Sequence, residues 1–321
     1  MRRMTLFGRT AGAAATAVAL ALTLAACSSS GSSGGTGASS SGAAALPGKG
    51  KPAVVMGDKD FDEQFLLGEL YAQALRAKGF TITLKKNIGA SEIIDKALTS
   101  GKIQMYPEYT GVIYSNAQLA NLGDKPASAK ATYDGAKGFE NKRGYDLLEP
   151  TPFQDADGVA VTKAYAAKNG LKTIDDLKKI KSFTYAGPPE NGTRYQGVLG
   201  LKQAYGLHNF TFKPLSTGSQ YGALDGGNVD SIAIFTTDAQ LASGKYATLT
   251  DTKGIFGYQQ VAPVVKKSVL TQQGPEFAKT LNAVSALLTT DAIISMNKAV
   301  QVDKKEPATV AKIFLQANHL A

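Results

Sequence analysis

Cysteine and histidine, the side chains that most often carry nucleophilic, redox or metal chemistry, are scarce in this 321-residue chain. Cys27 is the only cysteine, so the chain can form no internal disulfide and has no thiol elsewhere for catalysis or cofactor attachment. The two histidines, His208 and His319, are far apart in the sequence. Beyond residue 50 there is no His-x-x-x-His, Cys-x-x-Cys, Gly-x-Ser-x-Gly or phosphate-loop motif, which argues against the common enzyme classes.

Long apolar runs are also missing after residue 27, where none approaches the roughly 18 residues of a membrane-spanning helix. We therefore expect the body of the protein to be soluble. The one apolar run, residues 11–24, is too short to span a membrane and follows a basic segment that contains Arg2, Arg3 and Arg9. This order predicts a secretory signal peptide over residues 1–26.

The apolar run ends in Leu24-Ala25-Ala26-Cys27, which resembles a bacterial lipobox. The resemblance implies cleavage before Cys27 and a lipid thioether on its sulfur, and therefore a membrane anchor on the extracytoplasmic face. An ordinary signal-peptidase site beside an incidental cysteine is the alternative. Residues 27–50 are rich in glycine, serine and alanine, so we expect them to form a flexible linker.

The body that begins at Lys51 is long enough for two lobes of ordinary domain size. The chain has a formal net charge of +9, but its lysines are scattered and no nucleic-acid motif accompanies them. We therefore expect no nucleic acid as a partner. A mildly basic surface near anionic lipid headgroups is a weaker possibility.

Alternating strand and helix patterns indicate an α/β fold. Residues 53–57, 80–84 and 103–106 read as strands, and residues 62–78 and 90–100 as helices, with Ser91 as N-cap. A linker is expected near residues 120–148, after which the pattern resumes. Its expected strands are 158–162, 183–186, 210–213, 231–235 and 261–265, and its expected helices are 174–179 (with Thr173 as N-cap), 194–206, 219–226, 275–290, 291–300 and 306–317. We expect two lobes with parallel sheets and a site between them, at the carboxyl ends of the strands.

The chain resembles the substrate-binding proteins of glycine betaine, choline, carnitine and related osmoprotectant ABC importers over residues 53–317. The most specific motifs are Gly57-Asp58-Lys59-Asp60-Phe61-Asp62-Glu63-Gln64 and Tyr106-Pro107-Glu108-Tyr109-Thr110-Gly111. Supporting motifs include Ala186-Gly187-Pro188-Pro189-Glu190 and Phe235-Thr236-Thr237-Asp238.

The resemblance implies a periplasmic-binding-protein-like fold of type II, with a ligand cleft between two lobes. Residues 51–149 and 258–321 would form lobe one, and residues 150–257 would form lobe two, with a double crossing between them. It also implies that the protein is not an enzyme, needs no cofactor, and delivers its solute to a permease driven by a cytoplasmic ATPase.

In this family a quaternary ammonium group lies among tyrosine rings, and a carboxylate tail meets cationic groups. A quaternary ammonium has no N–H to donate, whereas an aromatic face attracts it by about 0.5–2 kcal/mol. By position, Tyr109 matches one ring of this box, and Lys59 and Gln64 match ligand-proximal positions. Glu190 and Arg194 match a spacing in which the arginine holds the ligand carboxylate. The plainer alternatives are a core tyrosine, a surface lysine, a helix-capping glutamine and a surface ion pair.

The chain departs from the family pattern at the other box positions. Asp155 and Asp157 stand near the place of a second tyrosine, and Phe235 stands at the third. The fourth falls at Gln259, beside Tyr258, and Val112 replaces a common threonine.

The aromatic box is therefore thinner and contains an anion, which favours choline-like or polyamine-like cations over glycine betaine. An acid–base role for the two aspartates, a different small solute such as an amino acid, and a sensory lipoprotein are the alternatives.

Overall fold

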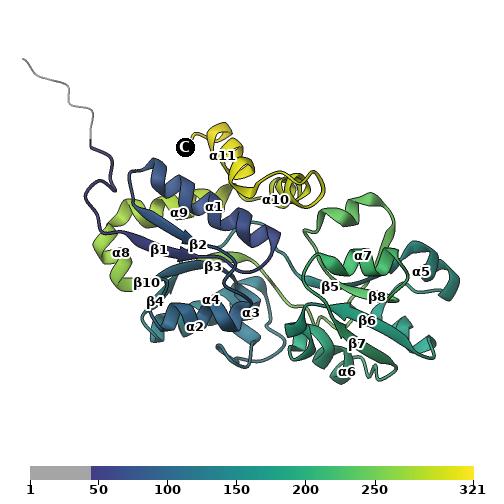
Figure 1. Cartoon of the computed structure of the whole chain (residues 1–321). Coiled ribbons are helices and arrows are strands. Elements are labelled where there is room, and N and C mark those ends of the chain that lie inside the picture. The colour runs from purple at the N-terminus through teal and green to yellow at the C-terminus, as the bar shows by residue number, and fades with distance from the viewer. Residues whose placement is uncertain (1–44) are drawn as a thin grey trace, which may run out of the picture. The chain divides into compact units, whose positions relative to one another are not determined.

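The computed structural model describes residues 45–321, which form two lobes built on two mixed sheets (Figure 1). Cys27, the expected signal peptide and most of the expected linker lie outside the described residues. Among residues 45–321, each helix is too short or too polar to cross a bilayer.

Sheet one has five strands in the order β2-β1-β3-β10-β4. They are β1 (Val54–Gly57), β2 (Ile82–Lys85), β3 (Met105–Tyr109), β4 (Tyr145–Leu147) and β10 (Val261–Lys266). Strands β1, β2 and β3 are parallel, whereas β10 runs antiparallel to β3 and β4. The chain thus returns from lobe two into the interior of sheet one.

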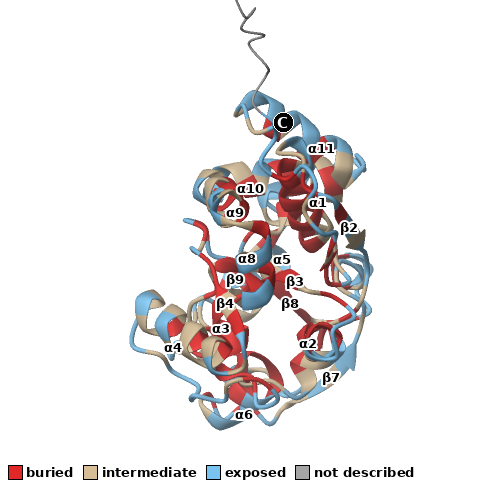
Figure 2. Cartoon of the chain, turned by 90° about the vertical axis from the view of Figure 1, so that its left-hand side faces the viewer, coloured by how far each residue is buried: buried red, intermediate tan, exposed pale blue. Residues whose placement is uncertain are grey.

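Helices cover both faces of sheet one (Figure 1). Their bounds are α1 (Asp62–Ala77), α2 (Ser91–Thr99), α3 (Thr110–Ser115), α4 (Ala129–Lys142), α8 (Lys267–Gln273), α9 (Pro275–Leu287), α10 (Thr290–Asn297) and α11 (Pro307–Ala317). One apolar core joins the sheet to α1, α9, α10 and α11, and another joins it to α2, α3 and α4. Helix α1 is central to the first core, because Leu66, Leu67, Leu70 and Ala74 form its buried face (Figure 2).

Sheet two has the order β7-β6-β8-β5-β9. Its strands are β5 (Asp157–Thr162), β6 (Phe183–Gly187), β7 (Phe210–Pro214), β8 (Ser231–Phe235) and β9 (Tyr246–Leu249), and its helices are α5 (Lys163–Asn169), α6 (Gly200–Gln203) and α7 (Ser219–Asp225). Strand β5 is antiparallel to both β8 and β9. Helix α7 packs on one face, and α5 and α6 pack on the other.

The two segments that connect the lobes lie side by side. Gln154 and Gln260 form an antiparallel bridge, and the N–H of Asp155 donates to the carbonyl of Gln259 over 3.0 Å. This pairing places the ends of β3, β5, β8 and β10 around one point.

Several local predictions are wrong. The segment near 120–148 contains α4 and β4, and β9, α5 and α8 were also not foreseen. The sheets are mixed because β5 and β10 run against their neighbours. Ala90 rather than Ser91 is the N-cap of α2, and the expected helix over 194–206 is broken at Gly197, whose φ and ψ are −140° and −130°.

The burial pattern of α1 predicts the cost of a cavity in lobe one. Leu70→Ala should lower the free energy of unfolding by about 2–5 kcal/mol, because Leu70 is fully buried. Ile313→Ala on α11 is the control, because Ile313 is 59% exposed and should change stability by less than about 0.5 kcal/mol. Urea denaturation of both variants measures the difference, and equal costs would contradict the assigned packing.

Candidate functional site

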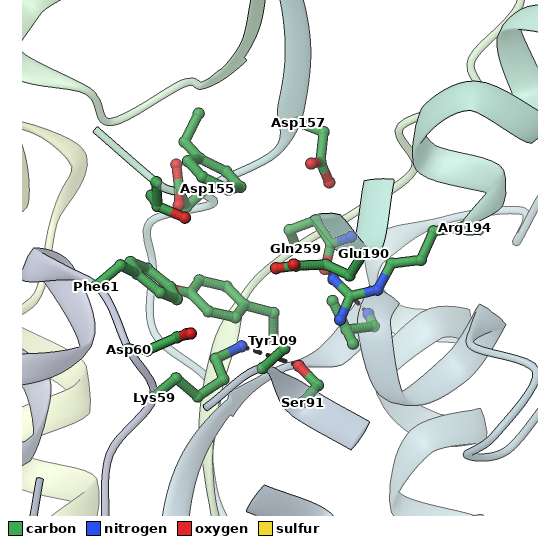
Figure 3. Close-up of a pocket in the computed structure, with 14 residues that line it drawn as sticks. Lys59, Asp60, Phe61, Ser91, Tyr109, Asp155, Asp157, Glu190, Arg194 and Gln259 are labelled. Carbon is green, nitrogen blue, oxygen red and sulfur yellow. Dashed lines mark hydrogen bonds between the residues drawn. The ribbon is translucent and has the colours of Figure 1, made fainter. Parts of the chain in front are cut away.

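A small cleft lies where the two lobes meet (Figure 3). The sequence-predicted residues that line it are Lys59, Tyr109, Asp155, Asp157, Glu190, Arg194, Phe235 and Gln259. The lining also includes Asp60, Phe61, Ala90, Ser91, Val112 and Thr217. Gln64 and Tyr258, which were predicted as site residues, do not line it.

Strand ends position the main side chains. Tyr109 is the last residue of β3, and Phe235 is the last residue of β8. Asp157 is the first residue of β5 and lies opposite Phe235 in the antiparallel register. Lys59 comes two residues after the end of β1. Groups from both sheets therefore face one cleft. Tyr109 and Phe235 lie at the carboxyl ends of their strands, and Asp157 lies at the amino end of β5, which is at the same edge of sheet two because β5 runs antiparallel to β8.

Three aromatic rings form a continuous wall across the lobes. The Phe61 ring is stacked 6.2 Å from Tyr109 and 5.9 Å from Phe235, measured between centroids. Phe61 was not predicted as a site residue, although it lies within the motif that carries the family resemblance. It lies four residues after the end of β1, as the N-cap of α1, so the signal available in the sequence was its position between a strand and a helix, two residues after Lys59.

Lys59 places a cation against this wall. Its Nζ lies 4.3 Å from the Tyr109 ring centroid, forms a 2.6 Å ion pair with Glu108 Oε1 and donates to Ser91 Oγ over 3.1 Å. Lys59 is almost fully buried and Glu108 completely so. The charge of Lys59 is thus balanced inside the protein, and Ser91 holds this lysine instead of capping α2.

Arg194 bridges the lobes. Its Nη2 donates to Glu92 Oε2 over 2.8 Å, and its Nε donates to Glu92 Oε1 over 3.1 Å. Partial burial alone would raise the pKa of Glu92, but the ion pair with Arg194 lowers it to about 2. Arg194 therefore lines the cleft as predicted, yet its fork is bound to Glu92, which the sequence did not single out, and its only ion pair among the described residues is with Glu92 rather than Glu190.

The cleft therefore contains two cations that are already paired, and carboxylates that are not. Among residues 45–321, neither Asp157 nor Glu190 forms an ion pair. Burial raises the pKa of Asp157 to about 7, against the lowering effect of Arg194 and Lys59. A positively charged group entering the cleft would favour the ionised form of Asp157.

Of the remaining predicted residues, Gln64 and Tyr258 lie behind or beside the cleft, whereas Gln259 lines it. Gln64 is fully buried inside α1, so it neither caps the helix nor reaches the cleft. Tyr258 lines a separate groove. Gln259 is fixed by its side-chain carbonyl, which accepts the Val112 N–H over 3.1 Å. Its amide nitrogen has no hydrogen-bond partner within the described part of the chain.

Further contacts hold the lobes together on either side of the cleft. Gln196 Nε2 donates to Ser115 Oγ over 2.6 Å, and the Thr237 hydroxyl lies 2.6 Å from Glu63 Oε2. The Tyr109 hydroxyl donates to the same glutamate over 2.8 Å. Glu63 was not predicted as a site residue, because nothing in its motif indicates that its carboxylate is buried behind a ring.

Two α/β lobes that enclose a small aromatic and charged cleft are the architecture of the periplasmic-binding-protein-like substrate-binding proteins, and the chain is of this class. Residues 52–317 match the family described as the substrate binding domain of ABC-type glycine betaine transport systems, and the chain belongs to this family. Members of the family are transport components and not enzymes.

Relatives and solved structures support this assignment. The chain is 30% identical to a glycine-betaine-binding protein of Pseudomonas aeruginosa, over 83% of this chain and 88% of that protein. It is 28% identical to an ergothioneine transport permease/ergothioneine binding protein of Helicobacter pylori, over 83% of this chain and 47% of that protein. A crystal structure of a glycine betaine/carnitine/choline ABC transporter protein is 26% identical, with a TM-score of 0.66 over 83% of this chain and 99% of that one.

The close approach of the second connector to α3 gives a testable prediction. A Cβ at Gly111 would lie 2.4 Å from the Tyr258 carbonyl oxygen and 2.7 Å from the Gln259 side chain. Gly111→Ala should therefore destabilise the protein by about 1–3 kcal/mol. Gly138→Ala in α4 is the matched control, because open space surrounds that Cβ, and it should stabilise by about 0.5–1 kcal/mol. Thermal unfolding that ranks the two variants in the opposite order would refute this view of the connector.

Proposed function

We propose that this protein captures a small organic cation, such as a choline-like quaternary amine, by closing its two lobes and delivers it to an ABC permease. Lobe one would consist of residues 51–149 and 258–321, and lobe two of residues 150–257. The charge distribution of the cleft carries the proposal: Lys59 and Arg194 are neutralised by Glu108 and Glu92, whereas Asp157 is unpaired among residues 45–321.

Attraction to a cation comes from two sources in this cleft. The rings of Phe61, Tyr109 and Phe235 offer an aromatic wall, and each ring face attracts a desolvated cation by about 0.5–2 kcal/mol. Asp157 adds direct charge attraction, which is strengthened when closure removes water. Lys59 already lies over one face of the Tyr109 ring, so fewer ring faces are free to bind a cation. The carboxylate of Asp157 compensates for this loss.

A carboxylate on the ligand would be attracted less strongly than a cation, because both cations of the cleft are already paired. The Nε and Nη2 edge of the Arg194 guanidinium is already engaged with Glu92, and two of the three Lys59 protons are donated to Glu108 and Ser91. Among residues 45–321, Arg194 Nη1 keeps its N–H groups free, but the charge of each cation is already balanced by a carboxylate of the protein. This supports choline over glycine betaine. A panel tested by thermal shift should contain both, with carnitine, ergothioneine, a polyamine and an amino acid, since a ligand at 100 times its Kd adds about 2.7 kcal/mol of stability.

The sign of the ligand charge can be tested by substitution. Asp157→Asn and Tyr109→Ala should each weaken choline binding about tenfold or more, equivalent to about 1.4 kcal/mol, when measured by calorimetry. Asp134→Asn on the exposed surface of α4 is the matched control and should leave affinity unchanged. Unchanged binding in Asp157→Asn, or a preference for an anionic amino acid, would show that the cleft does not select a cation.

We also propose that the mature protein begins at Cys27 and is held by lipid on the outer face of the cytoplasmic membrane, where the permease and its ATPase receive the solute. The order of basic residues, apolar run and Leu-Ala-Ala-Cys supports this. Cys27→Ser should release the protein from the membrane fraction of expressing cells, as judged by fractionation and immunoblotting. Retention of a processed Cys27→Ser protein in membranes would exclude the lipid anchor.

A further inference from the structure

A single hydroxyl group lies between two buried carboxyl groups beside the cleft. Thr237 Oγ1 is 2.6 Å from Glu63 Oε2 and 2.7 Å from Asp155 Oδ1. All three residues are at most 3% exposed. The hydroxyl of Tyr109, a ring of the cleft wall, donates to Glu63 Oε1 over 2.8 Å, and Asp155 lines the same cleft (Figure 3). The cluster is therefore in direct contact with the wall that the solute would meet.

The hydrogen atoms available for these two contacts do not suffice if both carboxyl groups are ionised. A threonine hydroxyl has one hydrogen to donate, and an ionised carboxylate has none. Two oxygen–oxygen distances of 2.6 and 2.7 Å therefore need a second hydrogen, which must be a carboxyl proton on Glu63 or Asp155. This proton belongs to the pair, because either carboxyl group can carry it while the hydroxyl donates to the other.

Other contacts complete the network. Glu63 accepts from the Tyr109 hydroxyl over 2.8 Å and from Asn297 Nδ2 over 2.7 Å. Asp155 Oδ1 accepts the backbone N–H of Thr237 over 3.0 Å. These donors can stabilise one negative charge on the pair, but an unshielded second charge in a dry site would be costly.

The charged groups around the pair act in the same direction overall. Burial raises the pKa of Glu63, and Lys59 opposes this from the β1–α1 turn. Burial also raises the pKa of Asp155 well above its usual range, and the charges of Glu63 and Asp238 raise it further.

Asp238 is the next residue after Thr237, and its Oδ2 accepts a hydrogen bond from the hydroxyl of Tyr221 in α7. Burial raises its pKa to about 6, and the charges of Glu63 and Asp62 add to this effect. Among these groups of the described network, Lys59 is the one cation that lowers a carboxyl pKa, and it does so for Glu63 alone.

The contact that links Glu63 to Asp155 through Thr237 forms only when the two lobes touch. Glu63 belongs to α1 of lobe one, whereas Thr237 follows β8 of lobe two. Asp155 lies in the first connector, before β5. Separation of the lobes would withdraw Glu63 from Thr237 and admit water, so that both carboxyl groups could ionise.

We propose that the closed cleft binds one proton between Glu63 and Asp155, so that solute capture is coupled to proton uptake. This inference rests on the lobe closure proposed above. A carboxyl group protonated in the closed form and ionised in the open form stabilises closure fully below its open-form pKa. That contribution is lost as the pH rises through the closed-form pKa. Between these values, affinity should fall by up to tenfold per pH unit from this source.

Asp157 has an effect of opposite sign and must be separated from the pair. Its pKa is raised to about 7 by burial, and a bound cation would favour the ionised form, so Asp157 releases a proton on cation binding. The comparison of wild type with Asp155→Asn cancels this contribution, because Asp157 is present in both. In the Asp157→Asn background, proton uptake by the pair should appear alone.

Calorimetry provides the test. Choline is titrated into each protein between pH 6 and 8 in buffers of different ionisation enthalpy, which gives the number of protons exchanged. We expect Asp155→Asn to take up close to one proton fewer than wild type near pH 7. Thr237→Ser keeps the hydroxyl and should match wild type. Equal proton numbers in wild type and Asp155→Asn would overturn the proposal.

A second measurement separates this proposal from the proposed function. Infrared spectra at pH 7 of a solute-free protein whose lobes are locked closed by a disulfide engineered between them should contain a protonated-carboxyl band that is absent when the same protein carries Asp155→Asn. If no organic cation binds, the proposed function fails while this band still reports the proton. If choline binds to both proteins with the same proton number and the infrared spectra agree, the shared proton is refuted and the proposed function stands.

Discussion

The antiparallel pairing of β10 with β3 is the constraint from which the site follows. Since β10 lies inside sheet one, the chain must leave lobe one, build sheet two and return along the same path. The two connectors consequently pair at Gln154 and Gln260. This pairing brings Asp155 and Gln259 to the end of β3, where Tyr109 lies. The C-terminal helices then cover α1, and α10 supplies Asn297 to the contact between the lobes.

Charge pairing inside the protein decides what this cleft can attract. A buried cation is tolerated only with a partner, and the chain provides Glu108 for Lys59 and Glu92 for Arg194. Arginine and lysine therefore contribute shape and donors to the cleft more than net positive charge. The same rule applied to Glu63 and Asp155 leads to a shared proton, since no cation is close enough to neutralise both.

Much of the fold and part of the site could be predicted from the sequence. The two α/β lobes and the placement of Tyr109, Asp157 and Phe235 at strand ends followed from periodicity and from the family motifs. The direction of β10 did not, because an apolar strand reads the same in a parallel or an antiparallel pairing. The partner of Arg194 was also hidden, because Glu92 is remote in sequence and Glu190 offered a local pair that the folded chain does not form.

Phe61 joins the two lobes through a contact between aromatic rings. It is stacked on Phe235 of the opposite lobe with the rings only 9° from parallel, and both rings belong to the protein itself. If the lobes open and close as proposed, an aromatic pair of this kind, worth about 0.5–1.5 kcal/mol, would enrich the closed population by roughly two- to thirteen-fold. Such a bias lowers the conformational cost of capture, yet it also increases the fraction of empty closed molecules. Those molecules would compete with loaded ones for the transporter. A stronger stack would therefore raise the affinity for the solute but also increase the binding of solute-free protein to the permease.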